Sequence, residues 1–410
     1  MNKYKTLAAL VATALLATAG AASAQTVTGG GASLPADLYK GKPDSILPAS
    51  FSYAVTGSGT GKKAFLENNS ALFQATGTVH FAGSDSVLSG TELTTYNTTY
   101  NVAGDANRYG ALIQVPSVAT SVTVPFNKAG GALNLNVTQI CGVFSGKITK
   151  WEDIAGSGRS GDLVVVYRDE SSGTSELLTR FLTTACTKAD VEGTTLKQVA
   201  WATGETAAPK FAVQSTFKNL FVNNTAPANF IPASATGGSA LYSTVQAAVG
   251  RIGYVSPDAI PAADNTEAAR QAALSDATKV AKVKGYSPNE VDVQATLESA
   301  APPSGADASD PAKWVPVFGN PANGYPIAGY TNLVFGQCYK ATAVANSLRG
   351  FLMNHYNAGT NGTNDAAVRA HGFIPLTKTW REAIRARFVL AGNAAALNNP
   401  STCANIGRPL

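Results

Sequence analysis

The sequence predicts an α/β fold with two lobes, and three observations lead to this prediction. Short apolar segments alternate with amphipathic ones along most of the chain, as in proteins whose sheets are mostly parallel. The chain has 410 residues, which is too long for one typical hydrophobic core. Glycine- and serine-rich segments lie at points where strands are expected to end and helices to begin, and such folds bind ligands there.

The expected elements follow in chain order. Apolar segments predict strands at 51–55, 79–82, 112–115, 121–125, 163–166 and 252–255. Amphipathic segments predict helices at 36–40, 137–143, 176–182, 239–249, 341–355 and 380–390.

The chain is expected to cross twice between the lobes. One crossing is the extended stretch 114–123, and the other lies within 311–332, after a linker at 299–310 that is rich in Ala, Pro, Ser and Asp. Lobe I would then comprise 25–118 and 321–410, and lobe II would comprise 119–320. The cleft between the lobes would be the ligand site.

The first 24 residues have the features of a signal peptide. Lys3 and Lys5 precede an apolar core at 7–16, and the small residues at 22–24 form a cleavage site. No cysteine follows the apolar core, so no lipid anchor is expected, and no later segment is long and apolar enough for a membrane helix. We therefore expect a soluble, exported protein, either periplasmic or secreted.

The four cysteines fit an oxidising compartment. An even number indicates two disulfides, for which three pairings are possible. We favour Cys141–Cys186 and Cys338–Cys403, because each pair closes within one half of the chain. The spacings suit no zinc site, and no metal or cofactor is expected.

The charge pattern argues against a nucleic-acid partner. The formal net charge is +5, yet no Lys/Arg run or basic stripe interleaved with aromatic residues is present. A weakly positive balance is compatible with an anionic ligand.

The segment 167–175 is the most informative part of the chain. It follows the strand expected at 163–166 and combines Arg168 with Ser171, Ser172, Gly173 and Thr174. A helix start has free N–H groups and the positive end of the helix dipole, and Arg168 adds a fixed positive charge. The segment therefore predicts a binding site for a small oxyanion.

Two further Gly/Ser loops precede expected helices. They are the loops at 29–35 and 58–61. A single loop of this kind is usually an ordinary cap or turn, but three of them, one beside an arginine, favour a shared anion site. Lys62 and Lys63 follow the second loop and are interpreted as solvated helix residues.

The chain resembles the periplasmic phosphate-binding proteins of phosphate import, and especially their DING branch. The matching segments span nearly the whole mature chain in order, at 29–35, 58–61, 79–86, 113–117, 141–146, 165–175, 315–319 and 406–410. The resemblance implies a two-lobe periplasmic binding-protein fold of type II that closes on one inorganic phosphate by a hinge. It also implies a monomer without a cofactor that delivers its ligand to an ABC-type phosphate permease.

The resemblance also implies the residues that contact phosphate. They are Ser33, Leu34, Ser58, Asp85, Arg168, Ser172, Gly173 and Thr174, with Leu34 and Gly173 acting through their backbone N–H groups. Glu170 stands where relatives of the importer type often carry Asp, and we expect it to hold the Arg168 guanidinium. At 26–29 the sequence reads Thr-Val-Thr-Gly in place of the Asp-Ile-Asn-Gly that names the branch.

Asp85 would distinguish phosphate from sulfate. An ionised carboxylate accepts hydrogen bonds and cannot donate them, so it can take one from a P–OH group, which sulfate lacks. Without the resemblance, the alternative for Asp85 is a turn residue after the strand at 79–82, and the alternative for Arg168 is a surface ion pair.

Two other functions stay open. A secreted alkaline phosphatase or phosphodiesterase is one, although no Gly-x-Ser-x-Gly elbow surrounds Ser172 and the chain has only His80, His355 and His371, all of which we interpret as structural. No catalytic residue is therefore assigned. A structural or adhesive exported protein is the other, which the Thr-, Asn- and Gly-rich composition favours.

Overall fold

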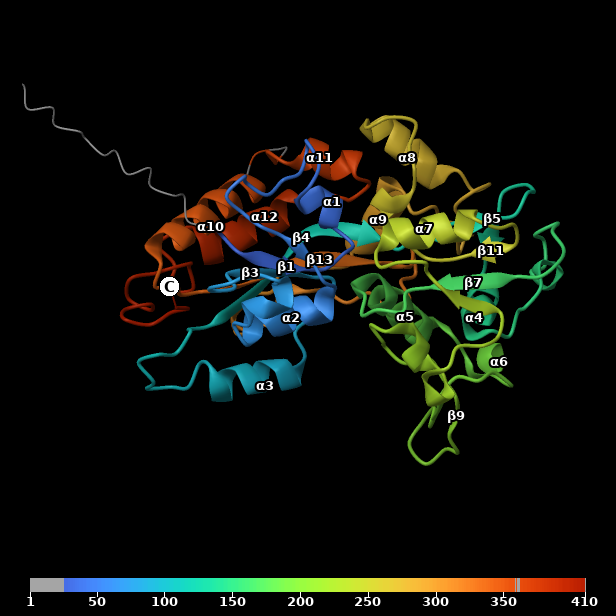
Figure 1. Ribbon diagram of the computed structural model, residues 1–410, viewed down its shortest axis with the longest axis horizontal. Helices are drawn as coiled ribbons and strands as arrows, with labels where there is room; N and C mark the ends of the chain where they lie inside the picture. Colours follow the sequence, from blue (N-terminus) through green and yellow to red (C-terminus); the bar gives the residue numbers. More distant parts are fainter. Residues whose placement is uncertain (1–25, 358, 360–361, 410) are drawn as a thin grey trace, which may run out of the picture.

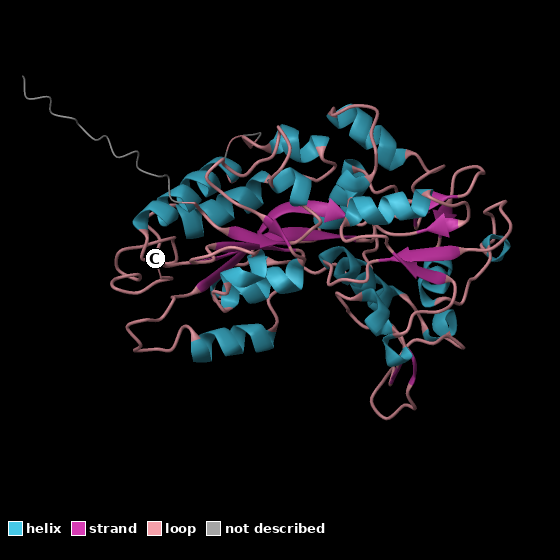
Figure 2. Cartoon of the chain, viewed as in Figure 1, coloured by secondary structure: helices cyan, strands magenta, loops and turns pink. Residues whose placement is uncertain are grey.

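The computed structural model describes residues 26–357, 359 and 362–409. The predicted signal peptide, 1–24, lies outside the described residues. Two larger β-sheets lie one after the other along the long axis of the molecule, and helices cover them (Figure 1, Figure 2). The prediction of an α/β fold is confirmed.

The first sheet has the strand order β2-β1-β3-β13-β4. Its strands are β1 (Gly29–Gly31), β2 (Ala54–Val55), β3 (Phe81–Ser84), β4 (Leu112–Ser121) and β13 (Ala328–Gly336). Strand β1 pairs in parallel with β2 and β3, whereas β13 pairs antiparallel with β3 and β4. Every residue of β4 and β13 is buried, so these two strands form the centre of the molecule.

The second sheet has the order β10-β7-β11-β5. Its strands are β5 (Phe126–Asn127), β7 (Val164–Tyr167), β10 (Phe230–Pro232) and β11 (Arg251–Ile252). Strand β7 is parallel to both of its neighbours, and β5 is antiparallel to β11. Two small ladders join β6 (Asn134–Leu135) to β12 (Lys282–Val283) and β8 (Gln198–Val199) to β9 (Ala208–Pro209).

Helices lie on both sides of each sheet. In Figure 1, α10 and α12 lie above the first sheet and α2 and α3 below it, while α7 and α5 lie on opposite sides of the second sheet. The α-helices are α1 (Ala36–Tyr39), α2 (Ser58–Leu66), α3 (Gly90–Thr99), α4 (Val137–Ser145), α5 (Gly173–Ala185), α6 (Lys188–Val191), α7 (Gly238–Gln246), α8 (Glu267–Ser275), α9 (Glu290–Leu297), α10 (Thr342–His355), α11 (Asp365–Ala370) and α12 (Lys378–Ile384). A π-helical turn, η8 (Arg385–Val389), continues α12.

Short 3-10 helices occupy several connections. They are η1 (Ser70–Phe73), η2 (Trp151–Asp153), η3 (Phe217–Leu220), η4 (Val222–Asn224), η5 (Pro257–Ala259), η6 (Asp307–Ser309) and η7 (Pro311–Trp314). Within the described part of the chain, no helix is both long enough and apolar enough to cross a membrane.

Both favoured disulfides are present. Cys141 of α4 is joined to Cys186, the residue that caps the end of α5. Cys338, which follows β13, is joined to Cys403 in the C-terminal segment. The first bond therefore joins α4 to the end of α5, and the second joins the C-terminal segment to the residues that follow β13.

The segment Gly29–Gly31 forms a strand, so our interpretation of 29–35 as a loop throughout is wrong at its start. Strand β1 lies between two neighbours that leave no room for side chains. A Cβ added to Gly29 would stand 2.1 Å from the Phe81 ring, and one added to Gly30 would stand 2.5 Å from the Ala54 carbonyl oxygen. Glycine is therefore required here by close packing of the sheet.

Near the centre of the molecule, the strand predicted at 121–125 is wrong beyond its first residue, and one long strand was missed. Ser121 is the last residue of β4, and the residues 122–125 form only isolated bridges, through Thr123 and Pro125. Strand β13 was expected only as part of a crossing. Its residues are apolar or uncharged on both faces, so they lack the alternation by which a half-buried strand is recognised.

Candidate functional site

The turn between β7 and α5 places Arg168 and the first residues of a helix at the end of a buried strand. Ser172 caps α5, since its Oγ accepts a hydrogen bond from the Ser175 N–H at 3.3 Å. The N–H groups of Gly173 and Thr174 precede the first intrahelical bond, so they are free to meet a ligand. The predicted strand–loop–helix at this position is present.

The start of α2 lies directly against this turn. A Cβ added to Gly57 would stand 2.3 Å from the Ser171 carbonyl oxygen, and one added to Gly59 would stand 2.9 Å from the Ser171 hydroxyl. The first turn of α2 contains Ser58, which we expected in a loop that precedes the helix. Two helix N-termini, one of a nine-residue and one of a thirteen-residue helix, therefore converge on one place.

Asp85 joins these two helix starts. Its backbone N–H donates to the Ser58 Oγ at 3.0 Å, and the Ser58 hydroxyl lies 3.4 Å from Asp85 Oδ2. A Cβ added to Gly173 would stand 2.2 Å from the same carboxylate oxygen. Glycine at 173 is thus what allows α5 to begin against Asp85.

Arg168 connects the second sheet to the residues before α1. Its Nη2 donates to the Ser33 Oγ at 2.9 Å, and its Nε pairs with Glu170 Oε1. Glu170 Oε1 also accepts from the Gly237 N–H at 3.0 Å. The expected contact between Glu170 and Arg168 is therefore present, and it holds one edge of the guanidinium and leaves other N–H donors available.

The predicted residues are gathered in one enclosed place. Ser58, Asp85, Arg168 and Ser172 are each 1% exposed or less. Leu34 is also buried, and its backbone N–H has no acceptor among the described residues. The Thr174 Oγ1 and Asp85 Oδ1 atoms are buried without a hydrogen-bond partner in the described part of the chain. Buried polar atoms without partners are costly, so their presence here points to a ligand.

The electrostatic setting of Asp85 is unusual for a carboxyl group. Burial raises the pKa of Asp85 to about 7, and the neighbouring Glu176 adds to this effect. The Thr331 hydroxyl acts in the opposite direction, as do the Ser58 hydroxyl and the Arg168 guanidinium. Near neutral pH the group is therefore poised between its acceptor-only form and its donor form.

Sequence reasoning missed several residues around the site. Tyr254 accepts from the Arg168 N–H at 3.1 Å and shares a 2.7 Å hydrogen bond with the Ser175 hydroxyl, so it positions both. Its distance of 86 residues from Arg168 left no local signal. Lys62 was expected to be solvated, and this is wrong, because it is buried and pairs with Glu92 at 3.0 Å.

Comparison with known proteins identifies the family. The family model of the PBP superfamily domain matches residues 16–352. The chain belongs to the PBP superfamily. Among curated relatives of this PBP-superfamily chain, "Alkaline phosphatase L" of Pseudomonas aeruginosa is 49% identical and covers both chains in full.

Solved structures agree with this assignment. A phosphate-binding protein from Stenotrophomonas maltophilia is 69% identical, covers 94% of this chain and 100% of its own, and has a TM-score of 0.86. A high affinity periplasmic phosphate-binding protein of the DING type, solved with bound phosphate, is 43% identical over the same shares, with a TM-score of 0.79. The PBP-superfamily fold and the resemblance to DING proteins that the sequence predicted are confirmed.

Proposed function

We propose that this protein binds inorganic phosphate between its two larger sheets. The observation that carries the proposal is the position of Asp85, a buried carboxyl group that touches Ser58 and Gly173 at two converging helix starts. The related proteins described as phosphate-binding support the same function. The ligand contacts would be those predicted from the sequence, at Ser33, Leu34, Ser58, Asp85, Arg168, Ser172, Gly173 and Thr174.

The site would offer phosphate several hydrogen-bond donors and one hydrogen-bond acceptor. The free N–H groups of α2 and α5, the hydroxyl groups and the remaining Arg168 donors would satisfy the unprotonated phosphate oxygens. Ionised Asp85 would accept the hydrogen of the P–OH group. Sulfate has no such hydrogen, and its oxygen would lie against a buried carboxylate that cannot donate. A site built on a required hydrogen bond rejects the mismatched analogue by roughly 10⁴–10⁵.

Closure would come from the two lobes. We assign lobe I to 25–118 and 321–410 and lobe II to 119–320, with the hinge in the two crossings, at 114–123 and within 311–332. Arg168 and Ser33 would then come from different lobes, and their hydrogen bond at 2.9 Å would form only on closure. We place the protein outside the cytoplasm as a monomer that delivers phosphate to an ABC-type permease.

Calorimetry tests the binding site and its selectivity. Ligand-stripped wild type at pH 8 is titrated with phosphate, with sulfate and with arsenate as a competitor. We expect phosphate to bind at least about 10⁴ times more tightly than sulfate. Asp85→Asn should narrow this ratio by about a hundredfold or more, because an amide can donate to sulfate. Asp169→Asn is the matched control, since Asp169 lies in the turn between β7 and α5, beside Arg168, but forms a half-exposed ion pair with Lys218. Equal affinity of wild type for both anions would refute the role of Asp85.

A phosphatase activity is the second candidate, because a full-length relative at 49% identity is named an alkaline phosphatase. The described residues contain no group of three or more His, Cys, Asp or Glu side chains suited to a metal. His80 is not placed as a base, because its Nδ1 accepts from the Thr28 N–H at 2.8 Å and burial lowers its pKa to about 4. Turnover of p-nitrophenyl phosphate by pure protein, lost in Asp85→Ala with the fold intact, would favour the enzyme.

A further inference from the structure

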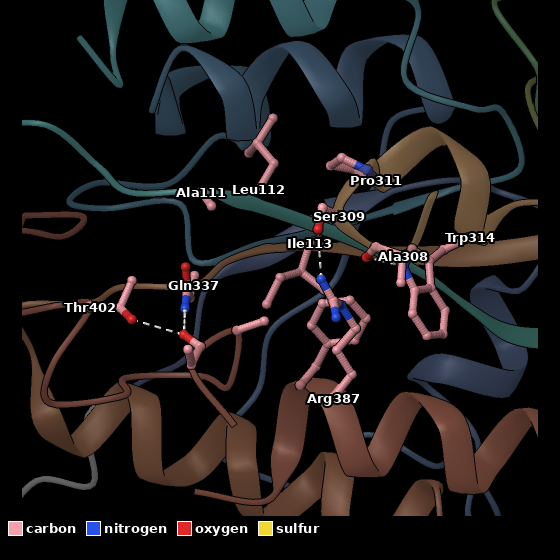
Figure 3. Close-up of a pocket in the computed structure, with 13 residues that line it drawn as sticks. Ala111, Leu112, Ile113, Ala308, Ser309, Pro311, Trp314, Gln337, Arg387 and Thr402 are labelled. Carbon is pink, nitrogen blue, oxygen red and sulfur yellow. Dashed lines mark hydrogen bonds between the residues drawn. The ribbon is translucent and has the colours of Figure 1, made fainter. Parts of the chain in front are cut away.

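A second cavity of about 300 Å³ lies at the far end of the first sheet (Figure 3). Its floor is the start of β4 and the residue after β13, and its walls come from η6, η7, η8 and the C-terminal segment. The lining residues are Ala111, Leu112, Ile113, Ala308, Ser309, Pro311, Trp314, Gln337, Arg387, Phe388, Ala394, Ala395 and Thr402. None of them belongs to the candidate phosphate site, so the cavity is a separate feature.

Most of this lining is apolar. Trp314 and Phe388 are buried and meet edge to face, with ring centroids 4.9 Å apart. The Trp314 indole N–H is satisfied by the Ala308 carbonyl, so the ring offers the cavity an apolar surface. A volume near 300 Å³ is at the small end for ligand pockets, which are typically apolar with a few placed polar groups.

Arg387 is the one charged residue among the described residues that line the cavity. Within the same part of the chain it forms no ion pair. Its guanidinium carbon lies 5.7 Å from the centroid of the Phe388 ring, and its one hydrogen bond runs from Nη2 to the Ser309 hydroxyl at 3.0 Å. Its Nε is buried and has no hydrogen-bond partner among the residues that the structure describes. Figure 3 shows the side chain extending from its helical turn toward Ser309. A guanidinium has five N–H donors, so most of them are left for a ligand with acceptor oxygens.

The backbone that presents Arg387 is itself unusual. Arg387 and Phe388 lie in the π-helical turn η8, a conformation that is rare and is found frequently at functional sites. The turn places a cation and an aromatic ring on consecutive residues at one cavity. The polar side chains of Gln337 and Thr402 on the opposite side both donate to the Ala394 carbonyl, so they hold the wall together.

We propose that this cavity binds a small amphipathic monoanion. Its apolar or aromatic body would pack on Trp314 and Phe388, and its carboxylate would pair with Arg387. No acidic residue is found among the described residues of the lining, which argues against a cationic ligand, and the apolar walls disfavour a free inorganic anion. The site is independent of phosphate binding.

Titration with two probes, benzoate and hexanoate, tests the proposal. The mature protein is first saturated with phosphate, so that the site between the sheets is filled. We expect at least one probe to bind saturably with a Kd of about 1 mM or tighter, measured by calorimetry and by tryptophan fluorescence, to which Trp314 contributes. Benzyl alcohol, which has the same ring without the charge, should bind at least about tenfold more weakly.

Three variants test whether the probe lies in this cavity and pairs with Arg387. Arg387→Gln should weaken the affinity for the probe at least about tenfold, since a hydrogen bond to a charged group is lost. Arg385→Gln is the matched control, because Arg385 lies in the same turn but does not line the cavity. Ala395→Leu should block binding of the probe, because the larger side chain fills the cavity. This variant tests the location of the probe if Arg387→Gln does not fold. The proposal is overturned if the phosphate-saturated wild type binds neither probe, or if Arg387→Gln and Arg385→Gln bind the probe equally.

Discussion

Replacing Asp85 by Asn should stabilise the ligand-free protein at pH 8. The carboxyl is 1% exposed, and burial raises its pKa from 3.8 to about 7. Between these two values the unfolded chain releases the proton while the folded chain keeps it. The free energy of unfolding therefore falls as the pH rises from about 4 to about 7, and the loss is complete above pH 7. Asparagine keeps the shape of the side chain and does not ionise.

The size of the effect follows from the shift. A difference of about three pKa units corresponds to about 4 kcal/mol, because each unit is worth about 1.4 kcal/mol. At pH 8 we expect the free energy of unfolding of ligand-free Asp85→Asn to exceed that of wild type by up to this amount. Near pH 4 we expect the two values to be equal. Burial also raises the pKa of Asp258 to about 7, so both proteins retain part of the pH dependence.

The assay is urea unfolding of ligand-stripped protein at several pH values, with Asp169→Asn as the control. Asp169 is half exposed in its ion pair with Lys218, so its replacement should change stability by less than about 1 kcal/mol at any pH. The quantity to compare is the slope of the free energy of unfolding against pH, in Asp85→Asn and in wild type. A variant that is less stable than wild type at pH 8, or that keeps the full wild-type slope, would refute the assignment of a buried, costly carboxylate.

Three further outcomes are expected. Arg168→Gln should lower phosphate affinity by about a hundredfold or more in calorimetry, because hydrogen bonds to charged groups contribute about 1.5–3 kcal/mol each; an unchanged affinity would remove Arg168 from the site. Gly173→Ala should abolish tight binding while the protein stays folded by circular dichroism, since the new methyl group would overlap Asp85; wild-type affinity would contradict this contact. Loss of Cys141–Cys186 through Cys→Ser at both positions should cost about 4 kcal/mol in urea unfolding, given the 45-residue separation, and no loss would show that the loop is already held by packing.

The local chemistry of the site could be predicted from the sequence. The residues 168–174 combine a charge, a helix start and small residues within one turn, so their arrangement depends little on the rest of the chain. The pairing of Glu170 with Arg168 is likewise a contact between residues two positions apart. The disulfides followed from the number and grouping of four cysteines.

The contacts between distant segments could not be predicted in the same way. Tyr254 supports Arg168 from 86 residues away, and nothing in the sequence around either residue indicates the contact. Lys62 looked solvated because its partner, Glu92, lies 30 residues further along the chain. Strand β13 is buried on both faces, and its lack of alternation hid it. In each case the missing information was tertiary, since burial and partner choice depend on which segments the fold brings together.

Burial makes Asp85 both costly and selective, and the two properties should change together. An exposed carboxylate would be screened by water, and its repulsion of a sulfate oxygen would be small. In the enclosed site the same charge destabilises the empty protein and repels any anion that brings no hydrogen. Asp85→Asn should therefore gain stability and lose discrimination against sulfate in the same variant. A gain in stability with undiminished discrimination would place the selectivity in the donor geometry of α2 and α5 rather than in the carboxylate.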